Sequence, residues 1–186
     1  MSTHLIKLEN AGKKYLSHRF SLIIEEGDFM IISGANGSGK TTLLMLILGF
    51  IHPDMGCISK RKLQMGYVPE KVILPPLVKV DEYLKTIARI KGGIIDYHLI
   101  HRLEIPCHKY MFELSKGNQQ KVAIYSAFLG NPHLIILDEP LSGIDEEMKD
   151  IIIDLIEEKH HEGIPMLIST HEPTSFIHLA TKHIEL

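Results

Sequence analysis

The sequence predicts an α/β fold with a mainly parallel sheet, an antiparallel β part near the N-terminus and a small helical lobe. Two nearly continuous apolar runs of strand length, Phe29–Ser33 and Leu134–Leu137, are typical of strands buried on both faces. Segments with helical spacing alternate with such runs, which indicates a sheet covered by helices on both sides. Because 186 residues suffice for one sizeable core but not for two ordinary domains, we expect a single domain over residues 1–186.

The first third of the chain predicts two antiparallel strands, then a buried strand and a helix. Residues 4–9 and 20–26 place apolar side chains with period two, as half-buried strands do. The strand at 29–33 runs directly into a glycine-rich segment, after which residues 41–49 are expected to form a helix. A turn at 52–56, which contains proline and glycine, then leads into a further short strand.

The middle of the chain predicts the helical lobe, at approximately residues 71–117. Residues 73–79 contain two consecutive prolines, and we expect them to form a loop. Residues 80–91 and 95–103 have helical spacing and are separated by two glycines, so two helices are expected there.

The last third predicts a helix at 118–129, a strand at 134–137, a long helix at 144–160 and a strand at 165–169. The long helix has acids in its first turn, where the helix dipole favours negative charge, and an apolar stripe along one side. That stripe consists of Ile144, Met148, Ile151, Ile152, Leu155 and Ile156.

The composition excludes several kinds of partner and site. A formal net charge of −3 with a pI near 6.4 leaves no basic excess of the kind that binds DNA or RNA, so no nucleic-acid partner is expected. Cys57 and Cys107 lack the spacing of zinc ligands or of a disulfide framework, which favours a reducing cytoplasm. The 12 histidines are expected on the surface or in the core rather than in a metal site. His171 is the exception with a proposed function, which is described below.

No targeting or membrane-spanning segment is expected. The start, Met1–His4, lacks the basic and apolar regions of a signal peptide. The longest apolar run, Leu43–Ile51, is about half of the roughly 20 residues that cross a bilayer. We therefore expect no direct membrane insertion, and any membrane association should come through another chain.

A glycine-rich segment between the expected strand and helix carries the first chemical signal. Residues 34–41, Gly-Ala-Asn-Gly-Ser-Gly-Lys-Thr, fit the GxxxxGK[ST] pattern of a phosphate-binding loop. Such glycines let backbone N–H groups turn towards phosphates, and the following helix presents its positive end to the same anion. Lys40 should reach the β and γ phosphates of ATP, while the Thr41 hydroxyl is placed to bind Mg²⁺. The residues expected to contact the nucleotide here are Gly34, Asn36, Gly37, Ser38, Gly39, Lys40, Thr41 and Thr42.

Two acids at the end of a buried strand carry the second signal. Asp138 and Glu139 directly follow the apolar run 134–137, and ligands of open α/β folds bind at the carboxyl ends of such strands. Asp138 is expected to reach Mg²⁺, and Glu139 to polarise a water for attack on the γ phosphate. Alone, the first pattern also fits a plain tight turn and the second a solvated acidic loop. Together they indicate a nucleotide phosphohydrolase of the P-loop class.

A third segment gives a resemblance to a family. Residues 114–118, Leu-Ser-Lys-Gly-Asn, resemble the LSGGQ signature of the ABC ATPases, and the resemblance extends over nearly the whole chain. A serine and a glycine at a helix N-terminus also form an anion site, although a simple serine cap is the plainer alternative. Residues 142–145 resemble the family's D-loop, and Ser169-Thr170-His171 resembles the segment that ends in its switch histidine.

The resemblance implies a dimer with a membrane partner. In that family, the signature of one subunit completes the ATP site of a second subunit, which assigns Ser115, Gly117 and Asn118 to the partner's nucleotide. It further implies that His171 contacts the γ phosphate and that Tyr15 stacks on adenine. The expected assembly is a homodimer or a heterodimer with another ABC ATPase subunit. Separate transmembrane permease subunits would hold this dimer at the inner face of the cell membrane.

Two positions depart from the family pattern. Glu70 stands where a glutamine is expected after Gly66-Tyr67-Val68-Pro69; it could still face Mg²⁺, but with a full charge and no amide donor. Asn118 replaces the last glutamine of the signature. The segment 114–121 resembles exporter-type subunits, so export is expected rather than import.

Two other functions remain as alternatives to a transporter subunit. One is a soluble ABC ATPase that acts on a macromolecular complex; the chromosomal type needs a long coiled coil, and only about 75 residues separate Lys40 from Ser115. The other is a nucleotide-binding regulatory module without turnover, which a phosphate-release assay would distinguish from an enzyme.

Overall fold

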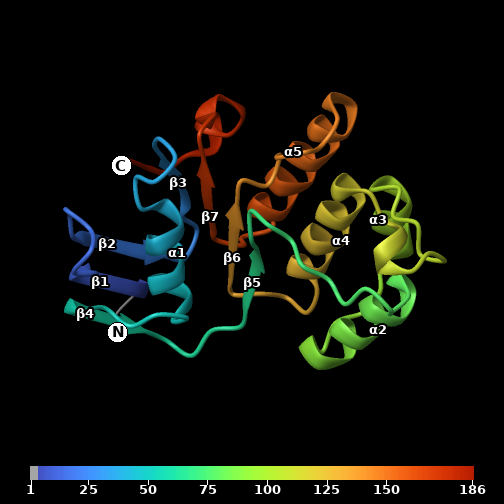
Figure 1. The fold of residues 1–186 in the computed structure, drawn as a ribbon, viewed down its shortest axis with the longest axis horizontal. Helices are drawn as coiled ribbons and strands as arrows, with labels where there is room; N and C mark the ends of the chain where they lie inside the picture. The colour runs from blue at the N-terminus through green and yellow to red at the C-terminus, as the bar shows by residue number, and fades with distance from the viewer. Residues whose placement is uncertain (1–3) are drawn as a thin grey trace.

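The computed structural model describes residues 4–186 and contains two sheets (Figure 1). One sheet has three strands in the order β2-β1-β4, and the other has five in the order β5-β6-β7-β3-β8. Residues 1–3, which carry most of the start that lacks a signal-peptide pattern, lie outside the described part.

The three-stranded sheet is the antiparallel part that the period-two segments predict. Its central strand, β1 (His4–Gly12), pairs antiparallel with β2 (Phe20–Glu25) on one side and with β4 (Met55–Lys60) on the other. Apolar side chains of β1 and β2, such as Ile6 and Ile24, are buried in one cluster with leucines of helix α1. The alternation of apolar residues in the sequence therefore marks the face that covers this helix.

The five-stranded sheet is parallel throughout, as expected for the buried strands. Three of its strands, β3, β6 and β7, are buried at every position. Because all five strands run in the same direction, their carboxyl ends meet at one edge, and the loops that follow them lie close together. The strands are β3 (Phe29–Ser33), β5 (Met65–Val68), β6 (Leu134–Asp138), β7 (Met166–Thr170) and β8 (Lys182–Glu185).

The helices divide the interior into two apolar clusters, one on each side of the parallel sheet. Helix α1 (Lys40–Leu48) lies between the two sheets and fills one cluster. Helices α4 (Lys116–Phe128) and α5 (Glu146–His161) supply much of the other, together with α2 (Val80–Lys91) and α3 (Tyr97–Arg102). Figure 1 shows α2 and α3 as an outlying group beside α4, where the helical lobe is expected. Short 3₁₀ turns occur at Met111–Glu113, Pro173–Ser175 and Ile177–Leu179.

Most expected elements are present, with small shifts at their ends. The expected helix at 80–91 has the same bounds in the structure, whereas the helix expected at 144–160 begins at Glu146. The later start has a physical cause, because the Asp145 side chain accepts a hydrogen bond from Met148 N and caps the helix. The strands β5 and β8 were not predicted. Within residues 4–186, no helix is both long and apolar enough to cross a membrane.

Candidate functional site

The glycine turn between β3 and α1 has the backbone shape that a phosphate loop needs. Gly34, Gly37 and Gly39 have φ values of 149°, 83° and 106°, a region that favours glycine. A side chain at Gly34 would collide with the backbone of Leu186 and approach Ser38 Oγ at 2.8 Å. The sequence therefore turns sharply here and delivers Lys40 to the first position of α1.

Inside this turn, polar groups are arranged to receive an anion. The Lys40 ammonium donates to the carbonyl oxygens of Gly34 at 2.7 Å and Ala35 at 3.2 Å, and its side chain is buried. Among the residues described, the buried Ser38 Oγ has no hydrogen-bond partner. A buried hydroxyl normally has a partner, so this one is suited to a ligand oxygen. A triphosphate would supply such oxygens to both side chains, and the loop therefore fits the expected group.

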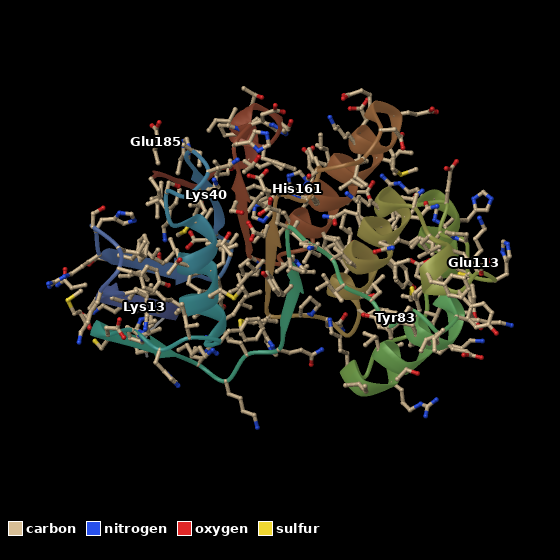
Figure 2. All side chains as sticks on the ribbon, viewed as in Figure 1. Lys13, Lys40, Tyr83, Glu113, His161 and Glu185 are labelled. Carbon is tan, nitrogen blue, oxygen red and sulfur yellow. The ribbon has the colours of Figure 1, made fainter. Side chains whose placement is uncertain are left out.

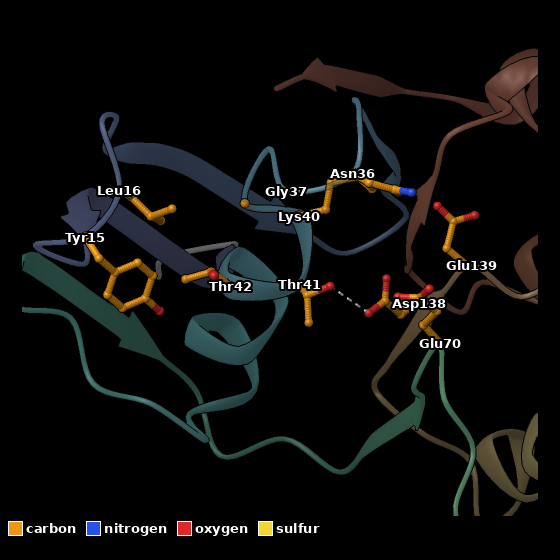
Figure 3. A pocket seen from close by; sticks show the side chains of 11 residues that line it. Tyr15, Leu16, Asn36, Gly37, Lys40, Thr41, Thr42, Glu70, Asp138 and Glu139 are labelled. Atoms are coloured by element: carbon orange, nitrogen blue, oxygen red, sulfur yellow. Dashed lines mark hydrogen bonds between the residues drawn. The ribbon is translucent and has the colours of Figure 1, made fainter.

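Asp138 is the last residue of β6 and is only 2% exposed. Its Oδ2 accepts a hydrogen bond from Thr41 Oγ1 at 3.3 Å, and its Oδ1 accepts one from Ser169 Oγ (Figure 3 shows the first). Burial raises the pKa of Asp138 and the charge of Glu70 adds to that effect, while the bond from Ser169 opposes it. The strand end thus holds a buried carboxyl group directly beside the phosphate loop.

Glu139 follows in an unusual backbone conformation. Its φ of 50° lies in the left-handed region, which is uncommon for a residue with a side chain and carries strain of about 1–3 kcal/mol. Its backbone N–H donates to the Ser169 carbonyl at 3.0 Å, which holds this conformation. Its carboxylate Oε2 lies 2.9 Å from His171 Nδ1. The turn therefore directs the acid away from its strand and towards the histidine that follows β7.

These groups line one cleft of about 550 Å³ (Figure 3). Figure 3 shows Tyr15 near one end and the acids at the other, with the phosphate loop between them. The Tyr15 ring is free to receive a ligand, since the residue is 69% exposed. The lining residues are Tyr15, Leu16, Asn36, Gly37, Gly39, Lys40, Thr41, Thr42, Glu70, Asp138 and Glu139. A nucleotide could span this length with its base at Tyr15 and its phosphates at Lys40.

A smaller hollow adjoins the cleft at its acidic end. It measures about 220 Å³ and is lined by Asn36, Glu70, Glu139, Ser142 and His171. Glu70 and Glu139 line both spaces, so the two hollows share the acidic wall. The structure thus brings His171 to the carboxylates, although it follows a different strand.

The oxygen groups beside the loop fit a magnesium ion bound together with a nucleotide. Mg²⁺ usually takes one or two protein carboxylates and completes its octahedron with phosphates and waters. The Thr41 hydroxyl and the Asp138 carboxylate supply oxygens of this kind, and Glu70 is near enough for its charge to act on Asp138. In the described part of the chain, no three His, Cys, Asp or Glu side chains are grouped to hold a metal ion by themselves.

The expected signature residues lie elsewhere, at the start of α4. Ser115 caps this helix, since its Oγ accepts from Asn118 N at 3.2 Å. A Cβ at Gly117 would be 3.1 Å from the carbonyl oxygen of Gly143, so this helix end packs closely on the loop after Glu139. Ser115, Gly117 and Asn118 line neither of the two hollows of their own chain.

Three further groups complete the site but were not singled out from the sequence. The buried Gln120 side chain donates to the Pro140 carbonyl at 3.2 Å and ties α4 to the acidic loop. Leu16 lines the cleft next to Tyr15. The Ser169 hydroxyl donates to Asp138 and is the one with a signal in the sequence, because a serine follows the apolar residues of the strand expected at 165–169.

Comparison with known proteins gives concordant matches. A family model described as ABC transporter matches residues 17–142. An uncharacterized ABC transporter ATP-binding protein of Methanocaldococcus jannaschii is 37% identical over 180 residues, which cover 90% of this chain and 68% of that protein. The zinc import ATP-binding protein ZnuC of Sodalis glossinidius is 31% identical over 192 residues, which cover 98% of this chain and 74% of that protein.

Two solved structures have the same fold as this chain over almost its full length. A dimeric bacterial ABC transporter cassette superposes with a TM-score of 0.84 at 24% identity, covering 97% of this chain and 94% of that one. An ABC transporter assigned to the metal-chelate type, in an inward-facing conformation, gives a TM-score of 0.81 at 26% identity, covering 100% and 80%. The expected α/β fold is thereby confirmed.

Proposed function

The chain belongs to the ABC transporter family of ATP-binding proteins and is an ATPase, and from this premise we propose that it drives transport as half of a head-to-tail dimer bound to separate membrane subunits. One observation carries the proposal of a complete hydrolytic site: Lys40, Asp138 and Glu139 line a single cleft, with His171 bonded to Glu139. These are the groups needed to bind a triphosphate and to activate the water that attacks it.

We assign the nucleotide's position from the lining of the cleft. Its phosphates bind to the turn at 34–39, where Lys40 exchanges its bonds to two loop carbonyls for bonds to phosphate oxygens. Its base stacks on Tyr15 and rests against Leu16. Asn36, Thr41 and Thr42 line the space between these ends.

The hydrolytic roles follow from the acids and the histidine. Glu139 polarises the attacking water as general base, and His171 orients its carboxylate and contacts the γ phosphate. Thr41 and Asp138, with Glu70 beside them, would hold Mg²⁺. When bound, this ion would supply positive charge that offsets the negative charge of the phosphates.

The dimer proposal rests on the place of the signature. Ser115, Gly117 and Asn118 lie outside their own cleft, so they are available to the nucleotide of a partner subunit. A similar cassette is known as a dimer. Either a second copy of this chain or another ABC ATPase subunit satisfies this arrangement.

A groove beside the helical lobe is the proposed site for the membrane subunit. It measures about 180 Å³, and its lining includes Tyr67, Val72, Ile73, Tyr83 and Ile87 (Figure 2 labels Tyr83 on α2). This apolar lining beside Glu70 suits a short helix of a permease, which would link the membrane subunit to the nucleotide site. The protein would then sit at the inner face of the cell membrane through that partner.

For the direction of transport, we place metal import first. Export, expected from residues 114–121, gains no support, because the similar proteins named above include a zinc import protein and a metal-chelate type transporter. Co-purified membrane subunits, reconstituted in vesicles with this chain on the lumenal side, should accumulate ⁶⁵Zn²⁺ in the lumen only when ATP is enclosed with the chain. No uptake with intact ATP hydrolysis would refute metal import and leave the ATPase assignment intact.

We also propose that residues 1–186 form one ABC ATPase domain with the lobe at about 71–117. The two apolar clusters share the strands of one parallel sheet, so neither forms a separate unit. The central test of the proposed function is phosphate release by the purified chain with ATP and Mg²⁺. Capture of a membrane protein with about six apolar spans of roughly 20 residues would support transport. Capture of ribosomal or chromosomal proteins instead would favour the soluble alternative.

A further inference from the structure

Ser169 occupies a place in the sheet where a polar side chain needs a reason. It lies in β7 and is 0% exposed. The register of the parallel pair sets it directly opposite Asp138 at the end of β6. Buried hydroxyl groups are nearly always hydrogen-bonded, and an apolar residue here would continue the strand at no polar cost. The reason for a serine at this position should therefore lie in the hydrogen bonds that its hydroxyl makes.

Ser169 contacts both of the acids through different atoms. Its Oγ donates to Asp138 Oδ1, and its carbonyl oxygen accepts from Glu139 N at 3.0 Å. The second oxygen of Asp138, Oδ2, accepts from Thr41 Oγ1 at 3.3 Å. The two carboxylate oxygens are thus divided between a fixed donor inside the sheet and a donor that faces the cleft.

This division determines how the carboxylate is oriented. The terminal torsion of an aspartate side chain is broad, so one hydrogen bond leaves its plane free to turn. A second donor from a neighbouring strand fixes that plane. With Oδ1 held by Ser169, only Oδ2 points to the side where Thr41 and the cleft lie.

We propose that Ser169 is a positioning residue that orients Asp138 so that Oδ2 meets the metal ion of the bound nucleotide. This inference rests on the proposed function, because it assigns Asp138 to Mg²⁺. Groups that hydrogen-bond metal ligands typically change metal affinity or activity by about 10–100-fold when they are removed. The carbonyl bond to Glu139 does not depend on the side chain, so a substitution of Ser169 separates the metal role from the base role.

The test measures metal binding rather than turnover. The full chain is loaded with ADP and titrated with Mn²⁺, and free Mn²⁺ is followed by its electron paramagnetic resonance signal. Ser169→Ala should weaken Mn²⁺ binding about tenfold or more, while ADP affinity in EDTA stays at the wild-type value. The matched control is Ser126→Ala, which also removes a buried hydroxyl, one that donates to Val122 O at 2.7 Å within its own helix. This control should bind Mn²⁺ as the wild type does.

The outcomes separate this inference from the proposed function. Wild-type Mn²⁺ affinity in Ser169→Ala, or an equal loss of ADP affinity in EDTA, overturns the positioning role. A wild-type chain that binds neither ADP nor Mn²⁺ overturns the proposed function and this inference with it. If Ser169→Ala does not fold, Ser169→Cys keeps the shape with a weaker donor, and wild-type Mn²⁺ affinity in that variant also overturns the role.

Discussion

His171 Nδ1 lies 2.9 Å from Glu139 Oε2, so a solvent-facing ring is bonded to a buried acid. The histidine side chain is 58% exposed, whereas the glutamate side chain is 11% exposed. An ionised carboxylate only accepts hydrogen bonds, which assigns the proton to Nδ1 and leaves Nε2 for other contacts. His171 thus orients the Glu139 carboxylate. A carboxylate base held by a neighbouring side chain in this way is the arrangement expected where a water must be activated.

Glu139→Gln should retain ATP binding but slow phosphate release by roughly 10²–10⁴-fold, because the amide keeps the shape without accepting a proton. Stopped turnover should also accumulate an ATP-bound dimer, which size-exclusion chromatography would detect. Glu172→Gln is the matched control, since this exposed acid also lies near His171, at 3.7 Å. Turnover at the wild-type rate in Glu139→Gln would remove Glu139 from the role of base.

Lys40→Ala should weaken ATP binding and hydrolysis together. The ammonium is buried in the phosphate loop, and the substitution removes the only side-chain cation that lines the cleft among the described residues. Binding of a fluorescent ATP analogue measures the effect, with the exposed Lys62→Ala as control. Equal affinity in the two variants would contradict the placement of the phosphates.

Tyr15→Ala should reduce ATP affinity by roughly 2–12-fold, which corresponds to the 0.5–1.5 kcal/mol typical of an aromatic pair. Tyr15→Phe should bind like the wild type, because stacking needs the ring and not the hydroxyl. Because Tyr15 is exposed, Tyr15→Ala should not destabilise the fold, so a loss of affinity would not result from unfolding. Thermal unfolding of the variant checks this. An unchanged affinity in Tyr15→Ala would place the base elsewhere.

Asp138→Asn should raise the free energy of unfolding at pH 7 in EDTA while abolishing Mg²⁺-dependent turnover. Burial raises the pKa of this carboxyl above its usual 3.8, so the folded state binds more protons than the unfolded state above that pH. The wild type therefore loses stability as the pH rises from about 4, and the advantage of the variant should shrink as the pH falls towards 4. Urea denaturation at pH 4 and pH 7 measures both; an advantage independent of pH would contradict this origin.

Gly117→Ala should leave ATP binding to the monomer intact but reduce dimer formation. Alanine is compatible with a helix, but its methyl group would lie 3.1 Å from the Gly143 carbonyl oxygen. It would therefore displace the loop after Glu139, which packs against the start of α4. Sedimentation of the variant in the Glu139→Gln background reports the dimer. Gly12→Ala is the control, since Gly12 has no positive φ and a Cβ there would lie 3.4 Å from its nearest neighbours, an ordinary contact distance. A dimer that survives would argue against the role given to the signature.

The sequence predicted those parts of the site that neighbouring residues build. The turn at 34–41 and the acids at 138 and 139 are contiguous, and their chemistry depends on a local strand end and helix start. The alternation of apolar segments likewise predicted the parallel sheet and the helices that cover it. These features need no knowledge of distant contacts.

What the sequence did not predict depends on pairs far apart in the chain. β5 has four residues and includes Gly66, whose missing side chain admits the backbone of Ala127. β8 alternates in exposure, and its His183 lies 2.8 Å from Ser33 Oγ. No local pattern in the sequence connects such partners, and the same holds for the hydrogen bond from Gln120 to the Pro140 carbonyl, which joins residues 20 apart.

The position of β3 in the sheet also constrains how the protein is synthesised. This strand carries the phosphate loop at its end, yet it pairs with β7, where Phe29 meets Met166, and with β8. While the ribosome is still translating the middle of the chain, the strand has neither neighbour and its apolar faces are open. The strand that carries the phosphate loop therefore gains both of its neighbours only after residues 166–185 have been synthesised, and until then its exposed apolar faces favour aggregation.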